Sequence, residues 1–397
     1  MEITDNIKWY YKEEIIMKKS INIKEVKIMK KVFMTLFFIA LSVVLVNGYA
    51  YAKVSGTCSA CHTMHNSEDG VPNNFDDDAT PNAKLLKGGC VGCHAQNTAD
   101  NVVDLVIPQV WHFNATDLAG GNFDGVVAAD GNGHNVSGVE AADATLANTP
   151  PGYSTSYDPA STDFSTSSRL VCAGQNGCHG NRDQSDEFNA VSGAHHGDDS
   201  ILHYGTDFTF TNQGADITKS YRMLYKIKGA EDPDWQNTNS ATDHNGYYGV
   251  AYASRTTQST WAGMTGTISE LCSECHGAFH ASPLSGDVGI GDGSPWERHP
   301  TDVVIPNSGE YASINTTYQD ETPVGRPAAF FTDDLAASAA KNGTVAPGDA
   351  DAGDIVICLS CHRAHGSNYA NSLRFNYTVS LASGAGCLHC HTTKDTF

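Results

Sequence analysis

Cysteine and histidine recur in this chain in one fixed order that suits covalent haem attachment. Five motifs have two residues between their cysteines and a histidine directly after the second cysteine. These motifs are Cys58, Cys61 and His62; Cys90, Cys93 and His94; Cys272, Cys275 and His276; Cys358, Cys361 and His362; and Cys387, Cys390 and His391. Thiols at this spacing add to the two vinyl groups of a haem, and the histidine lies under the iron as the proximal ligand. Zinc and redox sites also use two cysteines at this spacing, but the recurring histidine favours haem.

A sixth motif, Cys172, Cys178 and His179, is stretched, with five residues between its cysteines. A loop of that length can still span the edge of a porphyrin, whereas a disulfide or a vacant site are the open alternatives. With this motif all twelve cysteines are used. The sequence therefore predicts six covalently attached c-type haems (Fe), with His179 as the sixth proximal ligand.

Each haem iron also needs a ligand on its distal side, and histidine is the abundant candidate. Eleven histidines remain outside the motifs, whereas Met64, Met223 and Met264 are the methionines that follow the N-terminal leader. Three methionines cannot serve six irons. We therefore expect haems with two histidine ligands, a low-spin state, a low reduction potential and no open iron position.

Spacing restricts which iron some of these histidines can reach. His65 and His365 each stand three residues after a proximal histidine, and His280 stands four after another. Residues this close project from one side of a helical turn. Such a histidine cannot reach the far face of the haem that its own motif holds, so it serves a different iron if it binds one.

The other spare histidines are weaker candidates. His389 lies inside the loop between its two cysteines, against the edge of its own haem, so we do not expect it to be a ligand. His195 and His196 are adjacent and point in different directions, so we expect at most one of them to bind. His203 and His244 stand in polar stretches, which favours solvated surface histidines.

The first fifty residues belong to targeting rather than to the fold. Residues 29–52 read as a signal peptide, with a basic start, an apolar stretch and a small-x-small cleavage site that ends at Ala52. A retained anchor is the alternative, although the apolar stretch is short for a membrane span. Residues 1–28 are expected to be an over-called N-terminus, and residues 53–397 a single hexahaem unit. The protein is thus expected to be exported through the periplasm to the cell surface or beyond it.

Composition narrows the partners and the fold class. The chain has 45 acidic against 24 basic residues and a net charge of −21, which excludes nucleic acid as a partner. With 38 glycines and long polar stretches, we expect a multihaem cytochrome c fold: mostly coil with a few short helices and minor strands, wrapped round a continuous stack of six haems. Helical turns are expected at 269–280 and 334–341 and across the attachment motifs, with short strands at 221–227 and 374–380.

Several blocks of sequence resemble the hexahaem c-type cytochromes of the OmcS kind, which polymerise into extracellular conducting filaments. The blocks are residues 58–67 (Cys-Ser-Ala-Cys-His-Thr-Met-His-Asn-Ser), Trp111-His112, Gly133-His134-Asn135, residues 271–280, Arg298-His299-Pro300, residues 358–365 (Cys-Leu-Ser-Cys-His-Arg-Ala-His), residues 374–376 and residues 387–391. The resemblance spans nearly all of 53–397, but the stretched third motif departs from the family pattern. The resemblance implies a largely irregular fold and marks six distal ligands: His65, His112, His134, His280, His299 and His365.

The function predicted from these observations is electron transport. The chain would take electrons from an upstream cell-surface or periplasmic redox protein and pass them from haem to haem to an extracellular acceptor, as a head-to-tail homopolymer. The resemblance implies that His65 binds the iron held by His362 in the next subunit. The alternatives are a monomeric periplasmic shuttle and a multihaem reductase, which needs an iron with an exchangeable position.

Overall fold

The structure of the chain is a computed structural model, and it forms two compact units, Met1–Ala50 and Tyr51–Phe397. It describes residues 30–31, 57–65, 67–68, 71–72, 75, 80–144, 150–152, 169–197, 210–251, 266–280, 299–331, 343–348, 353–378 and 386–392. The expected signal peptide and the stretch before it lie outside these residues, except for 30–31. Among the described residues, no helix has the length and apolarity that crossing a membrane requires.

Regular secondary structure is sparse, which confirms the prediction of a mostly irregular fold. The α-helices are α2 (Cys58–Cys61), α3 (Cys90–His94), α4 (Asp124–Ala128), α5 (Glu187–Ala190) and α7 (Ile268–Ser273). The 3-10 turns are η1 (Ala83–Leu85), η2 (Asp130–Asn132), η4 (Ala194–His196), η6 (Phe210–Asn212), η7 (Ile217–Lys219), η8 (Tyr221–Met223), η9 (Gly277–His280), η11 (Gly309–Tyr311), η12 (Ala328–Phe330), η14 (Cys358–Ser360), η15 (Ala370–Ser372) and η16 (Gly386–His389). Five of the six attachment motifs carry one of these short helices, and the stretched motif does not.

The expected helical turns at 269–280 are present as α7 and η9. The Thr267 side chain caps α7, because its hydroxyl oxygen accepts a 3.1 Å hydrogen bond from the backbone N–H of Glu270. The turn expected at 334–341 lies outside the described residues. The strands expected at 221–227 and 374–380 were wrong in the part described. Arg222 and Met223 have φ of 49° and 57°, a left-handed backbone that cannot continue a strand.

In the described part of the chain the strands are short and form three small sheets. They are β1 (Ser67–Glu68), β2 (Val71–Pro72), β3 (Val102–Val103), β4 (Ile107–Pro108), β5 (Gly229–Ala230), β6 (Gly246–Tyr248), β7 (Val303–Val304), β8 (Gly325–Arg326) and β9 (Ile355–Val356). β1 pairs with β2 and β3 with β4, while the third sheet has the order β5-β6-β8-β9-β7. In that sheet β6 and β8 are parallel and the other neighbours are antiparallel.

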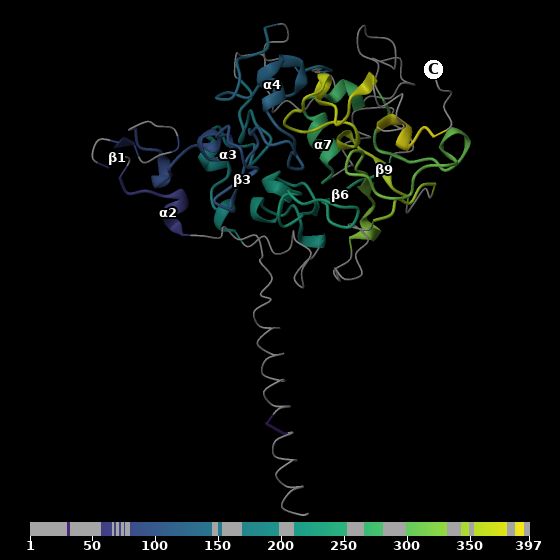
Figure 1. Cartoon of the computed structure of the whole chain (residues 1–397), viewed down its shortest axis with the longest axis horizontal. Helices are drawn as coiled ribbons and strands as arrows, with labels where there is room; N and C mark the ends of the chain where they lie inside the picture. Colours follow the sequence, from purple (N-terminus) through teal and green to yellow (C-terminus); the bar gives the residue numbers. More distant parts are fainter. Residues whose placement is uncertain are drawn as a thin grey trace, which may run out of the picture. The chain divides into compact units, whose positions relative to one another are not determined.

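The largest apolar cluster lies where this five-stranded sheet meets the fourth and fifth attachment motifs. Its members are Tyr221, Leu224, Ile227, Tyr247, Ile268, Leu271, Ile355, Ile357 and Leu359. Side chains from β6, β9, α7 and η14 thus pack together, and α7, β6 and β9 lie close to one another in Figure 1. This core fixes motif four against motif five, because Leu271 precedes Cys272 and Leu359 follows Cys358.

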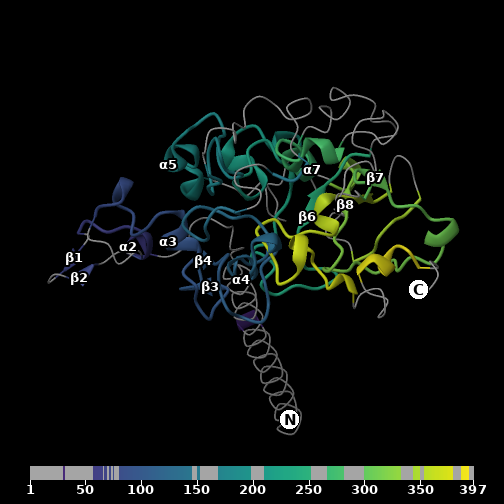
Figure 2. The same ribbon diagram turned by 90° about the horizontal axis from the view of Figure 1, so that it is seen from above.

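The first motif is held by a different segment of the chain. An isolated antiparallel bridge joins His62 to Leu86, and the Lys84 ammonium donates hydrogen bonds to the Phe188 carbonyl and to the Ser192 hydroxyl. Within the unit from Tyr51 onward, α2, β1 and β2 lie on the side opposite to β7 and β8 (Figure 2). The first motif is therefore tied to the segment around α5, far along the sequence.

Candidate haem-binding sites

Five of the six proximal histidines have the same hydrogen-bond partner, a backbone carbonyl. The distances from Nδ1 to oxygen are 3.1 Å for His62 to Lys84, 2.9 Å for His94 to Pro108, 2.9 Å for His179 to Arg222, 2.7 Å for His276 to Pro151 and 2.8 Å for His362 to Asn371. A carbonyl oxygen can only accept, so Nδ1 carries the proton and donates it. This tautomer leaves Nε2 as the metal ligand, and the hydrogen bond fixes the orientation of the ring.

Five proximal histidines also have a second histidine ring opposite them. The pairs and their ring-centroid separations are His62 with His196 (6.1 Å), His94 with His195 (6.1 Å), His179 with His365 (6.2 Å), His276 with His134 (6.1 Å) and His391 with His299 (5.9 Å). Two imidazoles that share a metal ion are separated by two metal–nitrogen bonds of about 2.0–2.1 Å and two ring radii, about 6 Å in all. The ring pairs therefore fit a haem iron between them.

His195 and His196 were underestimated in the sequence analysis. We expected at most one of them to be a ligand, but the structure places them opposite the proximal rings of two different motifs. They lie in η4, which begins after Gly193 in a left-handed conformation with φ of 84°. Because a 3-10 helix has three residues per turn, adjacent side chains diverge by about 120°. That divergence lets adjacent histidines serve neighbouring sites, and a Gly-Ala pair directly before two histidines is the signal that could have indicated it.

His134 and His365 were expected as distal candidates and lie opposite His276 and His179. Two hydrogen bonds join the segments that carry these two histidines. His134 donates from Nδ1 to the Ala364 carbonyl at 2.7 Å and from its backbone N–H to the His365 carbonyl at 3.0 Å. Burial lowers the pKa of His134, and burial lowers the pKa of His365 to about 3. Both imidazoles are thus neutral, the form that binds metals.

His112 was also expected as a distal ligand, but the structure gives it a different environment. Its ring is fully buried, and Nδ1 accepts a hydrogen bond from the Asn114 backbone N–H at 3.3 Å, so the ring proton is on Nε2. That atom lies 3.9 Å from the Asp117 carboxylate. The Asn122 side chain holds the His112 backbone through two further hydrogen bonds. Nε2 is nevertheless buried without a hydrogen-bond partner, so the role of His112 as a distal ligand stays a prediction.

His244 is not the solvated histidine that the sequence suggested. It is fully buried and stacks on Tyr318, with ring centroids 3.5 Å apart and planes 5° from parallel. Its Nδ1 donates to the Asn245 carbonyl at 2.7 Å. His203 and the side chain of His280 lie outside the described residues, so their predicted roles stay predictions.

The fifth motif differs from the others because His362 has no histidine ring opposite it among the residues that the structure describes. His362 is exposed. His65, which the resemblance assigns to this iron in the next subunit, is also exposed. His389 lies beside Thr322, whose hydroxyl is 2.8 Å from its Nδ1.

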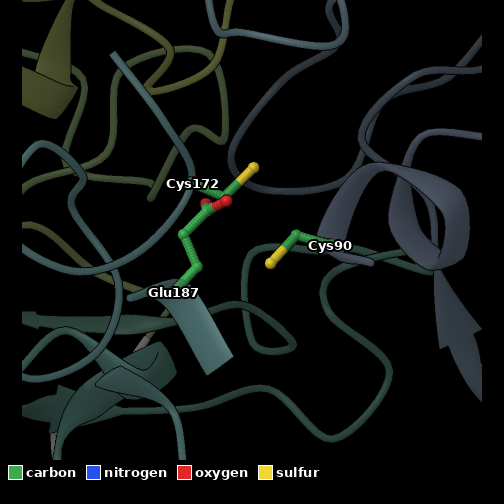
Figure 3. A group of neighbouring side chains, drawn as sticks. All are labelled: Cys90, Cys172 and Glu187. Atoms are coloured by element: carbon green, nitrogen blue, oxygen red, sulfur yellow. The ribbon is translucent and has the colours of Figure 1, made fainter. Parts of the chain in front are cut away.

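The cysteines of consecutive motifs lie close together in the first half of the chain. The sulfurs of Cys90 and Cys172, together with a carboxylate oxygen of Glu187, all lie within 4.8 Å of one another. Figure 3 shows Cys90 next to Cys172, with the Glu187 carboxylate at the side of Cys172. None of the twelve cysteines, including Cys172 and Cys178 of the stretched motif, forms a disulfide. The second and third motifs therefore meet at their attachment atoms.

Cys93 and Cys275, the second cysteines of the second and fourth motifs, are positioned through the backbone. The carbonyl of Cys93 accepts hydrogen bonds from the side-chain amides of Gln96 and Gln109, both at 2.9 Å. The backbone N–H of Cys275 donates to the Cys272 carbonyl at 3.2 Å. Both thiols are half-buried.

Cys93 is expected to bind the same haem as Cys90, yet the group formed by Cys90, Cys172 and Glu187 does not include it. The two thiols of a motif must reach different vinyl groups of one porphyrin, so only one of them is needed at the contact between motifs. The attachment roles of Cys93 and Cys275 therefore stay predictions.

The contact between neighbouring motifs continues through the later ones. A hydrogen bond with Cys358, followed by burial and then the nearby Cys178, raises the pKa of the Cys272 thiol well above its usual value. Burial and then repulsion from the thiolate forms of the neighbouring Cys387 and Cys390 raise the pKa of Cys361 to about 12. These thiols become thioethers when a haem is attached, so their proximity matters more than their titration. This proximity places motif four beside motif five and motif five near motif six.

Arginine side chains brace the fifth motif. The Arg374 guanidinium donates to the carbonyls of Leu359 at 2.6 Å and of His362 at 3.2 Å, on either side of Cys361. It also donates to the Asp320 carbonyl at 3.1 Å. Arg363 donates to the Leu118 carbonyl at 3.0 Å. The backbone that carries His362 is therefore fixed to segments from two distant parts of the chain.

Comparisons with known proteins indicate which kind of protein the chain resembles. Residues 349–396 match the family described as "Doubled CXXCH motif". The chain is 27% identical over 395 residues to "C-type cytochrome OmcS" of Geobacter sulfurreducens (strain ATCC 51573 / DSM 12127 / PCA), and the match covers 84% of each protein. The predicted resemblance to this kind of protein is confirmed, and the findings support a multihaem c-type cytochrome with covalently bound haem.

Two solved structures are also similar to the chain. "Outer Membrane Cytochrome S Filament from Geobacter Sulfurreducens" has a TM-score of 0.43 at 20% identity and covers 83% of this chain and 85% of that one. "Cryo-EM of the OmcS nanowires from Geobacter sulfurreducens" has a TM-score of 0.40 at 20% identity and covers 82% and 85%.

Proposed function

We propose that this chain is an exported electron carrier that holds six covalent haems and assembles head to tail with its own copies into an extracellular filament. The single observation that supports this most is the proximity of consecutive attachment motifs. The second lies beside the third, the fourth beside the fifth, and the fifth beside the sixth. The first and second are linked through the adjacent His196 and His195.

The residues that would hold the haems are the twelve cysteines, the six proximal histidines and the histidines opposite them. When bound, c-type haem supplies one-electron redox chemistry at iron, and the protein sets spacing, axial ligation and burial. The chain's own contribution is to hold each pair of rings about 6 Å apart, with the carbonyl hydrogen bonds fixing the proximal side. Contact between consecutive motifs then gives electrons a continuous route.

The histidine pairs favour a carrier over a reductase. A reductase needs an iron position that substrate can occupy, and five sites have a histidine ring on each side. The exposed His362 marks a site that completes its ligation in another way. A monomeric shuttle is the second candidate function, because the acidic surface also suits a soluble carrier.

Assembly is proposed to complete the fifth site. His65 is exposed beside Met64, an apolar side chain that is 83% exposed, so this segment is suited to burial against a second copy. In a head-to-tail contact the His65 of one subunit binds the iron held by His362 of the next. Such heterologous contacts grow into open filaments when the rotation between subunits does not close a ring. Strongly acidic subunits repel, so added salt should favour growth.

The mass of the intact mature protein tests the haem count. Six covalent haems and a start at Lys53 are expected. A mass with five haems and two unmodified cysteines would remove the proposed role of Cys172 and Cys178.

A variant with His65→Ala tests assembly and separates the wire from the shuttle. It should keep six covalent haems, bind one carbon monoxide per chain in the reduced state and form no filaments in electron micrographs. His389→Ala is the matched control, since it removes a histidine that we do not assign as a ligand; it should form filaments and bind no carbon monoxide. Filaments with six low-spin haems in His65→Ala would show that the intersubunit ligand is wrong. Wild-type protein that stays monomeric at high salt would favour the shuttle.

A further inference from the structure

The sixth attachment site differs from the other five in the group that contacts its proximal histidine. In those five sites Nδ1 donates to a neutral backbone carbonyl. In the sixth, Nδ1 of His391 lies 3.2 Å from Oε1 of the Glu310 carboxylate. This Nδ1 is buried and has no hydrogen-bond partner of any kind in the part of the chain that the structure describes, so Glu310 acts on it as a nearby charge rather than through a hydrogen bond. A full negative charge thus stands where the other sites have a dipole.

Backbone contacts hold Glu310 in this position. Thr392, which directly follows His391, donates two hydrogen bonds to the Glu310 carbonyl, from its backbone N–H at 3.0 Å and from its hydroxyl at 2.9 Å. Glu310 belongs to η11, and the next residue, Tyr311, places its ring 5.1 Å from the His391 ring. The side chain of Glu310 is 34% exposed and that of His391 is 18% exposed. The segment that carries the carboxylate is therefore anchored to the residues that flank the histidine.

The hydroxyl of Tyr311 competes for the same carboxylate. Burial and a hydrogen bond to Glu310 raise the pKa of Tyr311, which means that the hydroxyl donates to the charged carboxylate. Each hydrogen bond that the carboxylate accepts reduces the negative charge that it presents to other neighbouring groups. Tyr311 therefore moderates the effect of Glu310 on His391.

Other charges near the fifth and sixth sites have opposite signs. At the sixth site a second carboxylate, Glu321, lies 3.8 Å from Nε2 of His389, within the attachment loop. At the fifth site the guanidinium groups of Arg363 and Arg374 bind the surrounding backbone. Negative charge stabilises the oxidised form of a haem, and positive charge stabilises the reduced form. The charges around the two sites, like the contact to Glu310, thus lower the reduction potential of the sixth haem relative to the fifth.

We propose that Glu310 is a positioning residue that gives the haem at Cys387 and Cys390 the lowest reduction potential in the chain. The inference rests on the proposed function, because it requires a haem at this site with His391 as its proximal ligand. A carboxylate charge 3.2 Å from Nδ1 would stabilise positive charge on the imidazole and on the iron that it binds, which favours the oxidised state. In a filament the sixth site would then recur once per subunit as the point that electrons enter least readily.

Glu310→Gln in the full-length holoprotein tests this proposal, with the six midpoint potentials measured by spectroelectrochemical titration. The variant keeps a side chain of the same size but removes the charge. One midpoint, the lowest, should rise by about 59 mV, which is a tenfold change in its equilibrium constant. The other five should stay where they are.

Glu321→Gln is the matched control, because it removes one negative charge from the same site without touching the ligand. The lowest midpoint potential of this variant should shift by less than corresponds to about a threefold change in the equilibrium constant. The reason is that the Glu321 carboxylate stands farther from the iron's ligand than Glu310 does. Tyr311→Phe should act in the opposite direction to Glu310→Gln, because it leaves the carboxylate to His391 alone, and should lower the same midpoint.

The outcomes separate this inference from the proposed function. A mass with unmodified Cys387 and Cys390 would overturn the proposed function at this site. Six covalent haems with equal shifts in Glu310→Gln and Glu321→Gln would overturn the role of Glu310 alone, because any nearby charge would then suffice. If Glu310→Gln yields no holoprotein, Tyr311→Phe decides: a lower midpoint supports the proposal, and an unchanged or higher one refutes it.

Discussion

Replacing Gly120 by alanine should remove the distal ligand of the third site while its covalent haem stays attached. A Cβ at Gly120 would lie 2.7 Å from both Cε1 and Nδ1 of His365, about 0.7 Å closer than the 3.4 Å at which ordinary contact begins. The ring cannot simply tilt away, because it also packs against Phe123 with ring centroids 5.3 Å apart. Metal–ligand distances tolerate about 0.2 Å. The displacement therefore exceeds what the bond to the iron can absorb.

The assay is carbon monoxide binding to the reduced protein in the proposed filament state, followed by visible spectroscopy. If the chain assembles as proposed, the assembled wild type should bind none, whereas Gly120→Ala should bind one molecule per chain and show one high-spin haem. Gly131→Ala is the matched control, since a Cβ there meets nothing within 4 Å. Intact mass should show six haems in all three proteins. If Gly120→Ala kept six low-spin haems and bound no carbon monoxide, His365 would not be the ligand opposite His179.

Three further predictions concern ligation, folding stability and its pH dependence. His195→Ala and His196→Ala should each convert one haem to a carbon monoxide-binding state, and the double variant two, because each ring faces a different proximal histidine. Asp354→Asn should lower the free energy of unfolding by about 3–5 kcal/mol in denaturant titrations, since it leaves the buried Arg326 charge uncompensated; replacing both residues by apolar ones should cost far less. Burial raises the pKa of Asp320 to about 6, so the folded chain binds a proton more readily than the unfolded chain and gains stability as the pH falls from above 6 toward 4. Asp320→Asn should raise stability at pH 7 and remove the gain in stability on acidification that Asp320 causes, as thermal melts between pH 7 and pH 4 would show.

The attachment motifs were predictable because their chemistry is local. Two thiols and a histidine within a few residues are enough to bind one haem, whatever the rest of the chain does. The expectation of an irregular fold followed from composition for a similar reason, since glycine-rich polar stretches form few regular elements. Where local backbone decided the structure, as at Arg222 and Met223, the alternating pattern was misleading.

The histidines opposite the proximal rings depend on long-range packing, which spacing does not reveal. His112 lies in a block that resembles the family and is fully buried, yet among the described residues it is not one of the histidines stacked opposite a proximal ring. His244 stands in a polar stretch, yet it is buried on Tyr318. In both cases the surrounding fold sets the tautomer or the burial of the ring. A sequence rule limited to a few neighbouring residues cannot include those partners.

The histidine pairs also constrain the order in which the protein can mature. Attachment of a haem needs one motif, but the ring opposite it comes from a distant segment: His196 for the first motif, His365 for the third. Each iron would therefore act as a cross-link that closes a long loop and reduces the entropy of the unfolded chain. A polypeptide exported from its N-terminus can carry its first haems before the residues that complete their ligation have crossed the membrane. Haem attachment would then precede folding, and coordination by the last part of the chain to arrive would complete it.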